Sequence, residues 1–500
     1  MIKRIIEFPY WHYVGLAAIV KLAVATQLPL TGDEAYFVIW GEHPAFGYYD
    51  HPPLTGWWLA VILWLFDPSV LGIRLTQLIA SFLPALMVAS VLRGDPNRQQ
   101  IGVVCALFLP IVLLNVFTTT DTLYTVFSLL AMWLYVERRE HCSIIRLLTI
   151  GGFLAAAFLS KYLAALVIFG IFVDQLVFGS NRLKNLMIMS IPLVLGVAFN
   201  GWWNYQNCGY NLLFNLVNRQ SNAELNIIQP LIYLISLVYV LLPLWIFVGL
   251  RYNALFWPTD QITRRWLCVS GAPLIALLGV SLFKPIGLHW LTPCLVALMI
   301  GMVRILPKIE PSRTIQASII GFGGVHTVLM LVVALFPIEH YIFDDERANK
   351  VQWYRHAPNL VEHLEHRYQG RPMIATPSYS RSAVLSFYAD NYVSVFGEGS
   401  RYGRQNDLIH SPMRYTESDV LIVGSTRHEV EGYRDYFRSS HVEQISVEGL
   451  TAHVLVGSGF NMQAYRETIE DMILNDYYAI PPEWPIGSCA FIERVRTDGN

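Results

Sequence analysis

The chain has 500 residues, of which 54% are hydrophobic and only 14% are charged, and its mean hydropathy is +0.42. Soluble domains usually carry about 25% charged residues, so the composition excludes an ordinary soluble protein for most of the chain. The formal net charge of −2 and the absence of a strongly basic half argue against nucleic acid as a partner.

The chain begins with a short basic stretch and a first apolar run. Lys3 and Arg4 precede the run at 11–30, which is either a cleavable signal peptide or a first membrane span. Residues 23–25 resemble a cleavage site, but Lys21 interrupts the apolar core and an acidic segment follows closely. These features favour a retained span.

The acidic segment is TGDEAYFVIWGEHPAFGYYDHPP, residues 31–53. It is rich in aromatic residues, which suit a membrane–water interface, and it contains no Lys or Arg. The run at 54–66 is short and tryptophan-rich and follows two prolines, so we expect an interfacial or re-entrant helix. Together, residues 31–66 are predicted to form the first extracytoplasmic loop and the floor of a functional site.

Further apolar runs of roughly 16–24 residues follow, long enough to cross about 30 Å of hydrocarbon. They are residues 70–92, 101–117, 122–136, 144–160, 162–178, 186–203, 227–250, 266–283, 287–303 and 315–337. Basic connections alternate with acidic or polar ones, and basic loops stay in the cytoplasm. The basic connections carry Arg93, Arg98, Arg138, Arg139, Arg146, Arg182, Lys184, Arg251, Arg264, Arg265, Arg304, Lys308 and Arg313. The pattern predicts about eleven transmembrane helices in the inner (plasma) membrane, with the N-terminus cytoplasmic and the C-terminus extracytoplasmic (periplasmic).

The chain becomes polar after Pro337. Short strand-like runs at 373–376, 392–396, 420–423 and 453–456 alternate with helix-compatible segments at 382–389 and 429–437. This alternation predicts a small extracytoplasmic α/β domain at 341–500, after a mostly α, polytopic transmembrane domain at 1–340. No known catalytic motif stands out in the C-terminal part.

The six cysteines show neither a CxxC pair nor a spacing typical of zinc ligands. Cys208 and Cys489 both fall on the predicted outer side, where a disulfide is possible, although connectivity cannot be deduced from sequence. We assign no metal ligands and no cofactor; a divalent cation held by the carboxylates is possible but has no compelling ligand set.

The predicted topology brings polar residues from distant segments to the outer ends of the spans. They are Asp33, Glu34, Asp50, His51, Asp121, Lys161, Tyr162, Lys284, His289 and Trp290. Ionisable groups at membrane depth are costly and therefore mark a candidate site. Each one alone could be a structural or snorkelling residue, so the prediction depends on their convergence.

Two interpretations are open for the acids of the first loop. Asp33 and Glu34 are either an N-cap and first-turn acid of a helix or a general base that takes the proton of an attacking hydroxyl. Asp50 and His51 precede Pro52 and the next proline, so they lie on a stiff turn. That turn is either merely solvated, or His51 binds an anionic group while Asp50 orients it or a sugar.

The remaining residues offer similar alternatives. Asp121 could be a helix cap, and Lys161, Lys284 and His289 could be snorkelling or structural. In the functional interpretation these cations stabilise the charge that develops on a departing phosphate, while an acid activates the acceptor.

The segments DEAYFVIWGEHPAFGYYDHPPLTGWWL, TTDTLYTVFSLL, LSKYLAALVIFG and GLHWLTPCLVAL occur in this order along the chain. They resemble the bacterial dolichyl-phosphate-mannose–protein mannosyltransferase-like enzymes, which are GT-C fold integral-membrane glycosyltransferases related to the lipid A aminoarabinose transferase. The resemblance covers residues 1–340, and its most specific part is the first-loop motif. In the C-terminal domain it extends to placement only.

The resemblance implies a polyprenyl-phosphate-linked sugar donor and transfer on the extracytoplasmic face, usually with inversion at the anomeric carbon. It implies that Asp33 is the catalytic carboxylate of the first loop, that Glu34 is its partner and that Asp121 lies near the donor. His51 stands where the family has a Lys before Pro-Pro, so the phosphate contact could pass to Lys161 or Lys284. Tyr162, His289 and Trp290 are expected to bind substrate with Asp50.

We therefore expect a glycosyltransferase that moves a sugar from the lipid-phosphate donor to a lipid, glycan or protein acceptor. One alternative is a ligase that transfers a whole lipid-linked oligosaccharide or O-antigen. A secondary transporter would spread its polar groups through mid-span positions rather than gather them at one face. A binding or scaffold protein would carry the polar loop incidentally.

Overall fold

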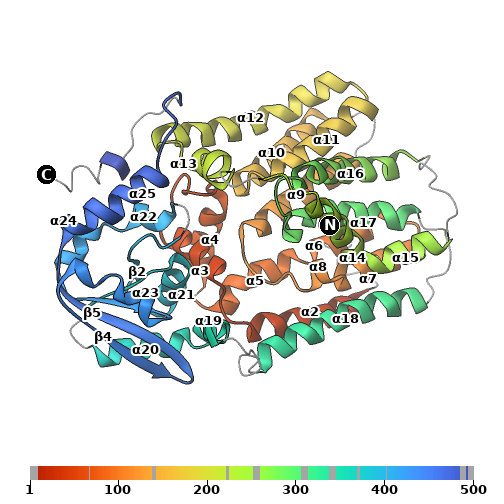
Figure 1. Ribbon diagram of the computed structural model, residues 1–500. Helices are drawn as coiled ribbons and strands as arrows, with labels where there is room; N and C mark the ends of the chain where they lie inside the picture. The colour runs from red at the N-terminus through yellow and green to blue at the C-terminus, as the bar shows by residue number, and fades with distance from the viewer. Residues whose placement is uncertain are drawn as a thin grey trace. The chain divides into compact units, whose positions relative to one another are not determined.

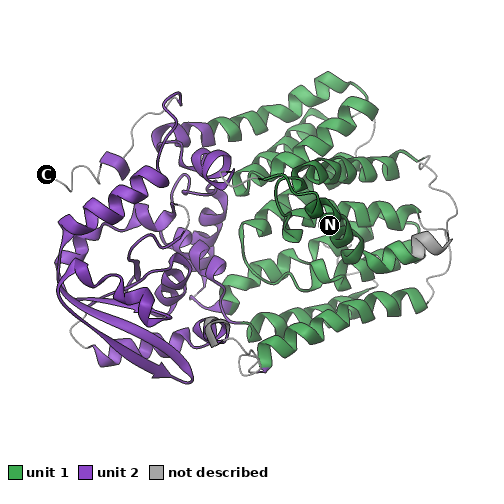
Figure 2. Cartoon of the chain, in the orientation of Figure 1, with its two compact units in different colours: residues 1–28, 71–199, 223–335 green, residues 29–70, 200–222, 336–500 purple. Residues whose placement is uncertain are grey.

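The computed structural model describes residues 10–66, 68–137, 142–220, 224–251, 260–305, 313–336, 345–368, 372–400, 403–484 and 491–493. The chain divides into two compact units, which Figure 2 colours separately. Unit 1 comprises residues 1–28, 71–199 and 223–335, and unit 2 comprises residues 29–70, 200–222 and 336–500. Each unit has its own hydrophobic core. The functional division of the chain at 340 stays a prediction, as do the expectations for Lys3, Arg4, Arg138, Arg139, Lys308 and Cys489, which lie outside the described residues.

All the secondary-structure elements assigned to the described residues of unit 1 are helices (Figure 1). Its helices are α2 (Trp11–Gln27), α5 (Val70–Ala80), α6 (Leu83–Val91), α7 (Pro96–Phe108), α8 (Pro110–Leu113), α9 (Thr120–Val136), α10 (Ile144–Ser160), α11 (Ala164–Phe178), most of α12 (Arg182–Gln206), α14 (Ile228–Val240), α15 (Leu242–Arg251), α16 (Gln261–Ser281), η3 (Leu288–Leu291), α17 (Thr292–Ile305) and α18 (Arg313–Leu335). Each apolar run expected from 11–30 and from 70–92 onward contains one or two of these helices, so the mostly helical architecture is confirmed.

Four described helical stretches are long and apolar enough to cross a membrane, namely α5 with α6, α12, η3 with α17, and α18. A fifth is added if α2 and α3 (Gly32–Glu42) form one broken span. In an apolar stretch of 18 residues in α18, only 22% is buried inside the protein, and the corresponding share in α12 is 28%. Large outward-facing apolar side chains of this kind suit hydrocarbon rather than water. The count of about eleven spans and the orientation of the termini stay predictions.

Several predicted runs are broken into two helices, and the breaks have local causes. Leu109 is extended before Pro110, which begins α8, because the residue before a proline is disfavoured in the helical region. Lys21, which is buried in α2, donates to the carbonyls of Val112 and Leu113 at the end of this short helix. The lysine that argued against a signal peptide thus binds carbonyls at the C-terminal end of α8, where a helix has no backbone partners for them.

Unit 2 contains the first loop, residues 200–222 and the C-terminal part of the chain. The loop holds α3 and α4 (Leu54–Leu65), which contact each other. At 12 residues, α4 is about 18 Å long and too short to cross a bilayer as a straight helix. Its interfacial placement stays a prediction.

The C-terminal sheet domain, the described residues from 345 onward, has one five-stranded sheet in the order β2-β1-β3-β5-β4. Its strands are β1 (Met373–Thr376), β2 (Ser394–Val395), β3 (Val420–Gly424), β4 (Phe437–Val447) and β5 (Leu450–Phe460). β1 pairs in parallel with β2 and β3, whereas β5 pairs antiparallel with β3 and β4. Its helices are α19 (Asp345–Arg355), α20 (Ala357–Arg367), α21 (Tyr379–Tyr388), α22 (Gln405–Ile409), α23 (Arg427–Glu431), α24 (Met462–Tyr465) and α25 (Asp471–Asp476). The expected α/β domain is therefore present.

Strand β4 was not expected from the sequence, and the helix expected over 429–437 is shorter, since α23 ends at Glu431 and β4 begins at Phe437. β4 forms an edge of the sheet and is largely polar along FRSSHVEQISV, so it lacks the apolar signature of a buried strand. A tight turn at Glu448 and Gly449, both with positive φ, joins it to β5. Such turns match the twist of paired strands and fix their register.

Glu429 in α23 provides a test of stability in this domain. Its carboxylate accepts from the backbone N of Ser425 at 2.8 Å and from its hydroxyl at 3.0 Å, and it pairs with Arg381. Burial raises the pKa of Glu429, but the bonds from Arg381 and Ser425 outweigh burial and hold the pKa below its ordinary value. A lowered pKa stabilises the fold above the ordinary value of 4.5, and this contribution is lost as the pH falls through the folded-state pKa.

We therefore expect Glu429→Gln to destabilise the sheet domain at neutral pH by about 1–3 kcal/mol and to weaken its sensitivity to acid. Hydrogen exchange of β3 and α23 in the full chain, at pH 7 and pH 4, measures both effects. Glu431→Gln is the matched control, since Glu431 pairs with Arg427 on the exposed side of the same helix. Equal protection of the Glu429→Gln variant and the unmodified protein at pH 7 would contradict the expectation.

Candidate functional site

The first two acids of the loop have different environments at the start of α3. Thr31 is the N-cap, and its Oγ1 accepts from the backbone N of Glu34 at 3.2 Å. The Glu34 carboxylate accepts from the backbone N of Thr31 at 3.2 Å and from its hydroxyl at 3.1 Å, which completes a capping box. Glu34 is fully buried, whereas Asp33 is exposed in the same turn. The expectation of Asp33 as the N-cap is therefore wrong, since Thr31 is the cap; Glu34 is the first-turn acid of the capping box, and Asp33 has the more accessible carboxylate.

Asp50 and His51 lie on a turn that is held from outside the loop. Asp50 Oδ2 is 3.3 Å from His51 Nδ1, and both side chains are less than one-fifth exposed. The Asn211 side-chain amide donates to the carbonyls of Tyr48, Tyr49 and His51. Asn215 donates to the Asp50 carbonyl at 3.1 Å. The turn is thus fixed by hydrogen bonds as well as by its prolines, rather than merely solvated.

Sequence reasoning missed these two asparagines. The signal that could have found them is the spacing of Asn211 and Asn215, since two amides four residues apart lie on one face of a helix. An apolar neighbourhood makes such repeated amides costly unless they have partners.

The C-terminal sheet domain also contacts the first loop. The backbone N of Gln405 donates to the Tyr36 hydroxyl at 2.9 Å, and Gln405 Oε1 accepts from the backbone N of Tyr49 at 2.9 Å. The Tyr36 hydroxyl in turn lies 3.5 Å from Asp50 Oδ1. No motif in the C-terminal third indicated this role, because the contact joins residues more than 350 positions apart.

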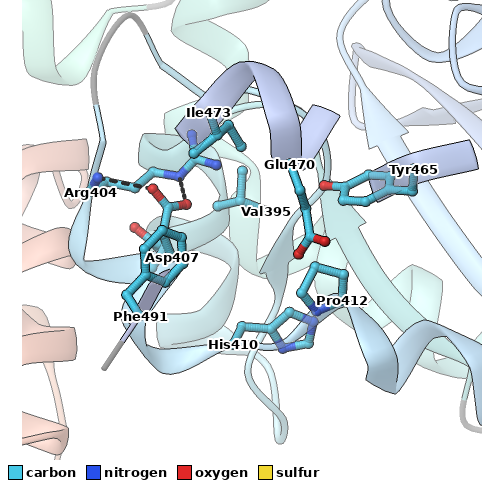
Figure 3. A pocket seen from close by; sticks show the side chains of 10 residues that line it. Val395, Arg404, Asp407, His410, Pro412, Tyr465, Glu470, Ile473 and Phe491 are labelled. Atoms are coloured by element: carbon cyan, nitrogen blue, oxygen red, sulfur yellow. Dashed lines mark hydrogen bonds and ion pairs between the residues drawn. The ribbon is translucent and has the colours of Figure 1, made fainter. Parts of the chain in front are cut away.

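The segment that carries Gln405 is anchored by a buried ion pair, shown in Figure 3. Arg404 Nε is 2.9 Å from Asp407 Oδ1, and the Tyr478 hydroxyl donates to Asp407 Oδ2 at 3.1 Å. Burial raises the pKa of Asp407, although Arg404 and Tyr478 act in the opposite direction. The pair borders a cavity of about 40 Å³, whose size suits a few water molecules rather than a sugar.

In unit 1, Asp121 and Lys161 form a close ion pair. Lys161 Nζ is 2.8 Å from both carboxylate oxygens of Asp121, and the two side chains are 13% and 10% exposed. Thr119, not Asp121, caps helix α9. Lys161 follows the last residue of α10 and points to the acid instead of extending into solvent. The capping and snorkelling alternatives therefore do not describe these residues.

The other predicted residues of unit 1 lie on neighbouring segments. His289 Nε2 is 3.9 Å from Asp121 Oδ2, and its ring contacts that of Trp290. Tyr162 follows Lys161 and packs on Phe158. Lys284 lies in the turn after α16. The structure therefore brings Asp121, Lys161 and His289 together and adds Trp290 through His289.

The predicted site residues thus form two groups, one in each unit. The first contains Asp33, Glu34, Asp50 and His51, and the second contains Asp121, Lys161 and His289. That both groups line one pocket stays a prediction. Among the described residues, no three His, Cys, Asp or Glu side chains are arranged to hold a metal ion. Cys208 is disulfide-bonded, whereas its possible partner Cys489 is not described.

Arg74 is a further residue that sequence reasoning missed. It is fully buried in α5 and donates to the carbonyls of Ala25 at 2.7 Å and Leu28 at 2.8 Å, where α2 ends. A cation here satisfies the last carbonyls of the helix and its negative dipole end. A lone Arg inside the apolar run 70–92 was the available signal.

A family model described as dolichyl-phosphate-mannose-protein mannosyltransferase matches residues 50–203. The lipid A galacturonosyltransferase RgtD of Rhizobium johnstonii is 25% identical over 181 residues, which are 35% of this chain. The match spans only 38% of the length of that curated relative.

Two crystal structures of ArnT from Cupriavidus metallidurans have a similar fold. The structure bound to undecaprenyl phosphate matches with a TM-score of 0.62 and 15% identity, and the apo structure matches with 0.59 and 14%. Each match covers 89% of this chain and 97% of the other. The family model includes Asp50, His51, Asp121 and Lys161, whereas Asp33 precedes it.

Proposed function

We propose that this protein, whose fold is that of the GT-C glycosyltransferases of the mannosyltransferase and ArnT type, transfers a sugar from a polyprenyl-phosphate-linked donor. The acceptor is a lipid, a glycan or a protein on the extracytoplasmic face of the inner membrane. The observation that carries the proposal is the Asp121–Lys161 pair, which lies inside the residues matched by the family model. The pair holds a cation in place, and a reaction in which phosphate departs requires a cation to stabilise the charge that develops on the phosphate.

In the proposed reaction Asp33 removes the proton from an acceptor hydroxyl. The hydroxyl oxygen then attacks the anomeric carbon, while the bond from that carbon to the phosphate oxygen breaks and its electron pair leaves with the lipid phosphate. Lys161, with Lys284, neutralises the charge on the departing phosphate. Attack opposite the leaving group inverts the configuration at the anomeric carbon.

Glu34 has a supporting part in this proposal. Its Oε2 atom accepts two hydrogen bonds from Thr31, so this oxygen is committed to the start of α3. It therefore fixes the turn that presents Asp33, and Asp33 acts as the base. Asp50 and His51, held by Asn211 and Asn215, orient the donor phosphate or the sugar.

The relatives narrow the proposed substrates. RgtD is named for transfer to lipid A, and one ArnT structure contains undecaprenyl phosphate. We therefore propose an undecaprenyl-phosphate-linked monosaccharide as donor and place lipid A first among the acceptors to be tested.

The direct test is mass spectrometry of envelope lipids, glycans and proteins from cells with and without the gene. We expect one lipid, glycan or protein species to lose a single sugar mass in the deletion strain and to regain it on complementation. Loss of a whole oligosaccharide would support a ligase, and an unchanged envelope would contradict the proposal. The purified protein, given monosaccharide or oligosaccharide carriers, separates the first two outcomes.

A further inference from the structure

The carboxyl end of strand β1 is a topological switch point in the C-terminal sheet domain. β1 pairs in parallel with β2 on one side and with β3 on the other. After β2, the chain therefore crosses to the opposite side of β1 to form β3. In open α/β sheets, ligands bind outside the carboxyl ends of strands at such points. Here β1 ends at Thr376, and Tyr379 begins α21 three residues later.

The start of α21 packs against the start of α3, and Figure 1 shows the two helices side by side. A methyl group on Gly32 would lie 2.8 Å from Ser380 Cβ and 3.4 Å from the Tyr354 hydroxyl, so glycine permits this close approach. One turn further along α3, the ring of Tyr36 meets that of Tyr379 edge-on at 5.3 Å between centroids. The first turn that carries Asp33 therefore adjoins Tyr379 and its neighbour Ser380.

The charged and titratable groups that face Tyr379 come from four segments. They are Asp33 and Tyr36 of α3, Asp50 of the loop, Tyr354 of α19 and Arg404 before α22. Burial, together with the negative charges of Asp33 and Asp50, raises the pKa of Tyr379 to about 12, although Arg404 acts in the opposite direction. The phenol therefore stays protonated near neutral pH and remains a hydrogen-bond donor.

We propose that Tyr379 is a positioning residue for Asp33, contributed by the C-terminal sheet domain. Its hydroxyl donates a hydrogen bond to the ionised carboxylate, which keeps that carboxylate charged and oriented toward the acceptor hydroxyl. The reaction itself rests on the proposed function, whereas the coupling between Tyr379 and Asp33 is measurable without it. The sheet domain then completes the surroundings of the base.

Tyr379→Phe in the full-length protein tests this proposal, because it keeps the ring against Tyr36 and removes only the hydroxyl. Loss of one hydrogen bond to a charged group is expected to lower kcat/KM at neutral pH by about tenfold. The acid limb of the pH–rate profile should move to higher pH, since the carboxylate loses a donor that favours its charged form. Tyr388→Phe, at the other end of α21, is the matched control and should leave both measurements unchanged.

A second readout does not depend on sugar transfer. Carbodiimide reacts with protonated carboxyls, so mass spectrometry of Asp33 labelling across pH reports the midpoint of its titration. We expect this midpoint to rise in Tyr379→Phe and not in Tyr388→Phe. If the unmodified protein transfers no sugar but the midpoint still rises, the proposed function fails and the coupling stands.

Two results would overturn the proposal. One is an unchanged labelling midpoint together with an unchanged pH–rate profile. The other is a fall in activity and melting temperature without any shift on the pH axis, since that pattern identifies Tyr379 as a packing residue only.

Discussion

Replacing Asp33 with asparagine should lower sugar transfer by about 10²–10⁴-fold, because an amide cannot take the proton of the acceptor hydroxyl. The side chain keeps its size and its exposed position in the first turn of α3. The capping box of Thr31 and Glu34 remains intact, so the variant should insert and melt like the unmodified protein. Turnover with a polyprenyl-phosphate-linked donor measures the effect.

Glu42→Gln is the matched control for this substitution. Glu42 is an exposed acid at the opposite end of the same helix, so its loss removes a similar charge without touching the first turn. Transfer by Glu42→Gln should stay within about twofold of the unmodified rate. Turnover of Asp33→Asn at the unmodified rate would refute the assignment of the base.

Replacing Lys161 with methionine is expected to impair both the fold and the binding of the donor phosphate. The substitution leaves the Asp121 carboxylate, which is 10% exposed, without its 2.8 Å partner. Breaking a buried pair by removing one partner costs about 3–5 kcal/mol, because an uncompensated charge stays inside the protein. The melting temperature and the affinity for undecaprenyl phosphate should therefore both fall.

The double variant Asp121→Asn/Lys161→Met separates the two effects. It removes both charges, so most of the lost stability should return. Affinity for undecaprenyl phosphate should stay low, because the cation that we propose to face the phosphate is still missing. If the double variant regains affinity together with stability, Lys161 is structural and does not contact the donor.

The local backbone was largely readable from the sequence. Apolar runs such as 144–160 and 122–136 predicted α10 and α9 nearly to the residue, because run length and helical propensity act within one segment. The pattern Thr31-x-x-Glu34 is itself a capping-box signature, and the short α4 was expected from its length and prolines. The polar edge strand β4 escaped because solvent-exposed strands need no apolar pattern.

By itself, then, the sequence determined the helical architecture, the presence of a C-terminal α/β domain and a short set of acids and cations worth testing. Only the tertiary structure decided which of them meet. Lys161 binds an acid 40 positions earlier, Asn211 holds a turn about 160 positions away, and Gln405 holds Tyr36 across 369 positions. Helix and strand signals arise from neighbouring residues, whereas these pairings depend on how whole segments pack, which no local pattern encodes.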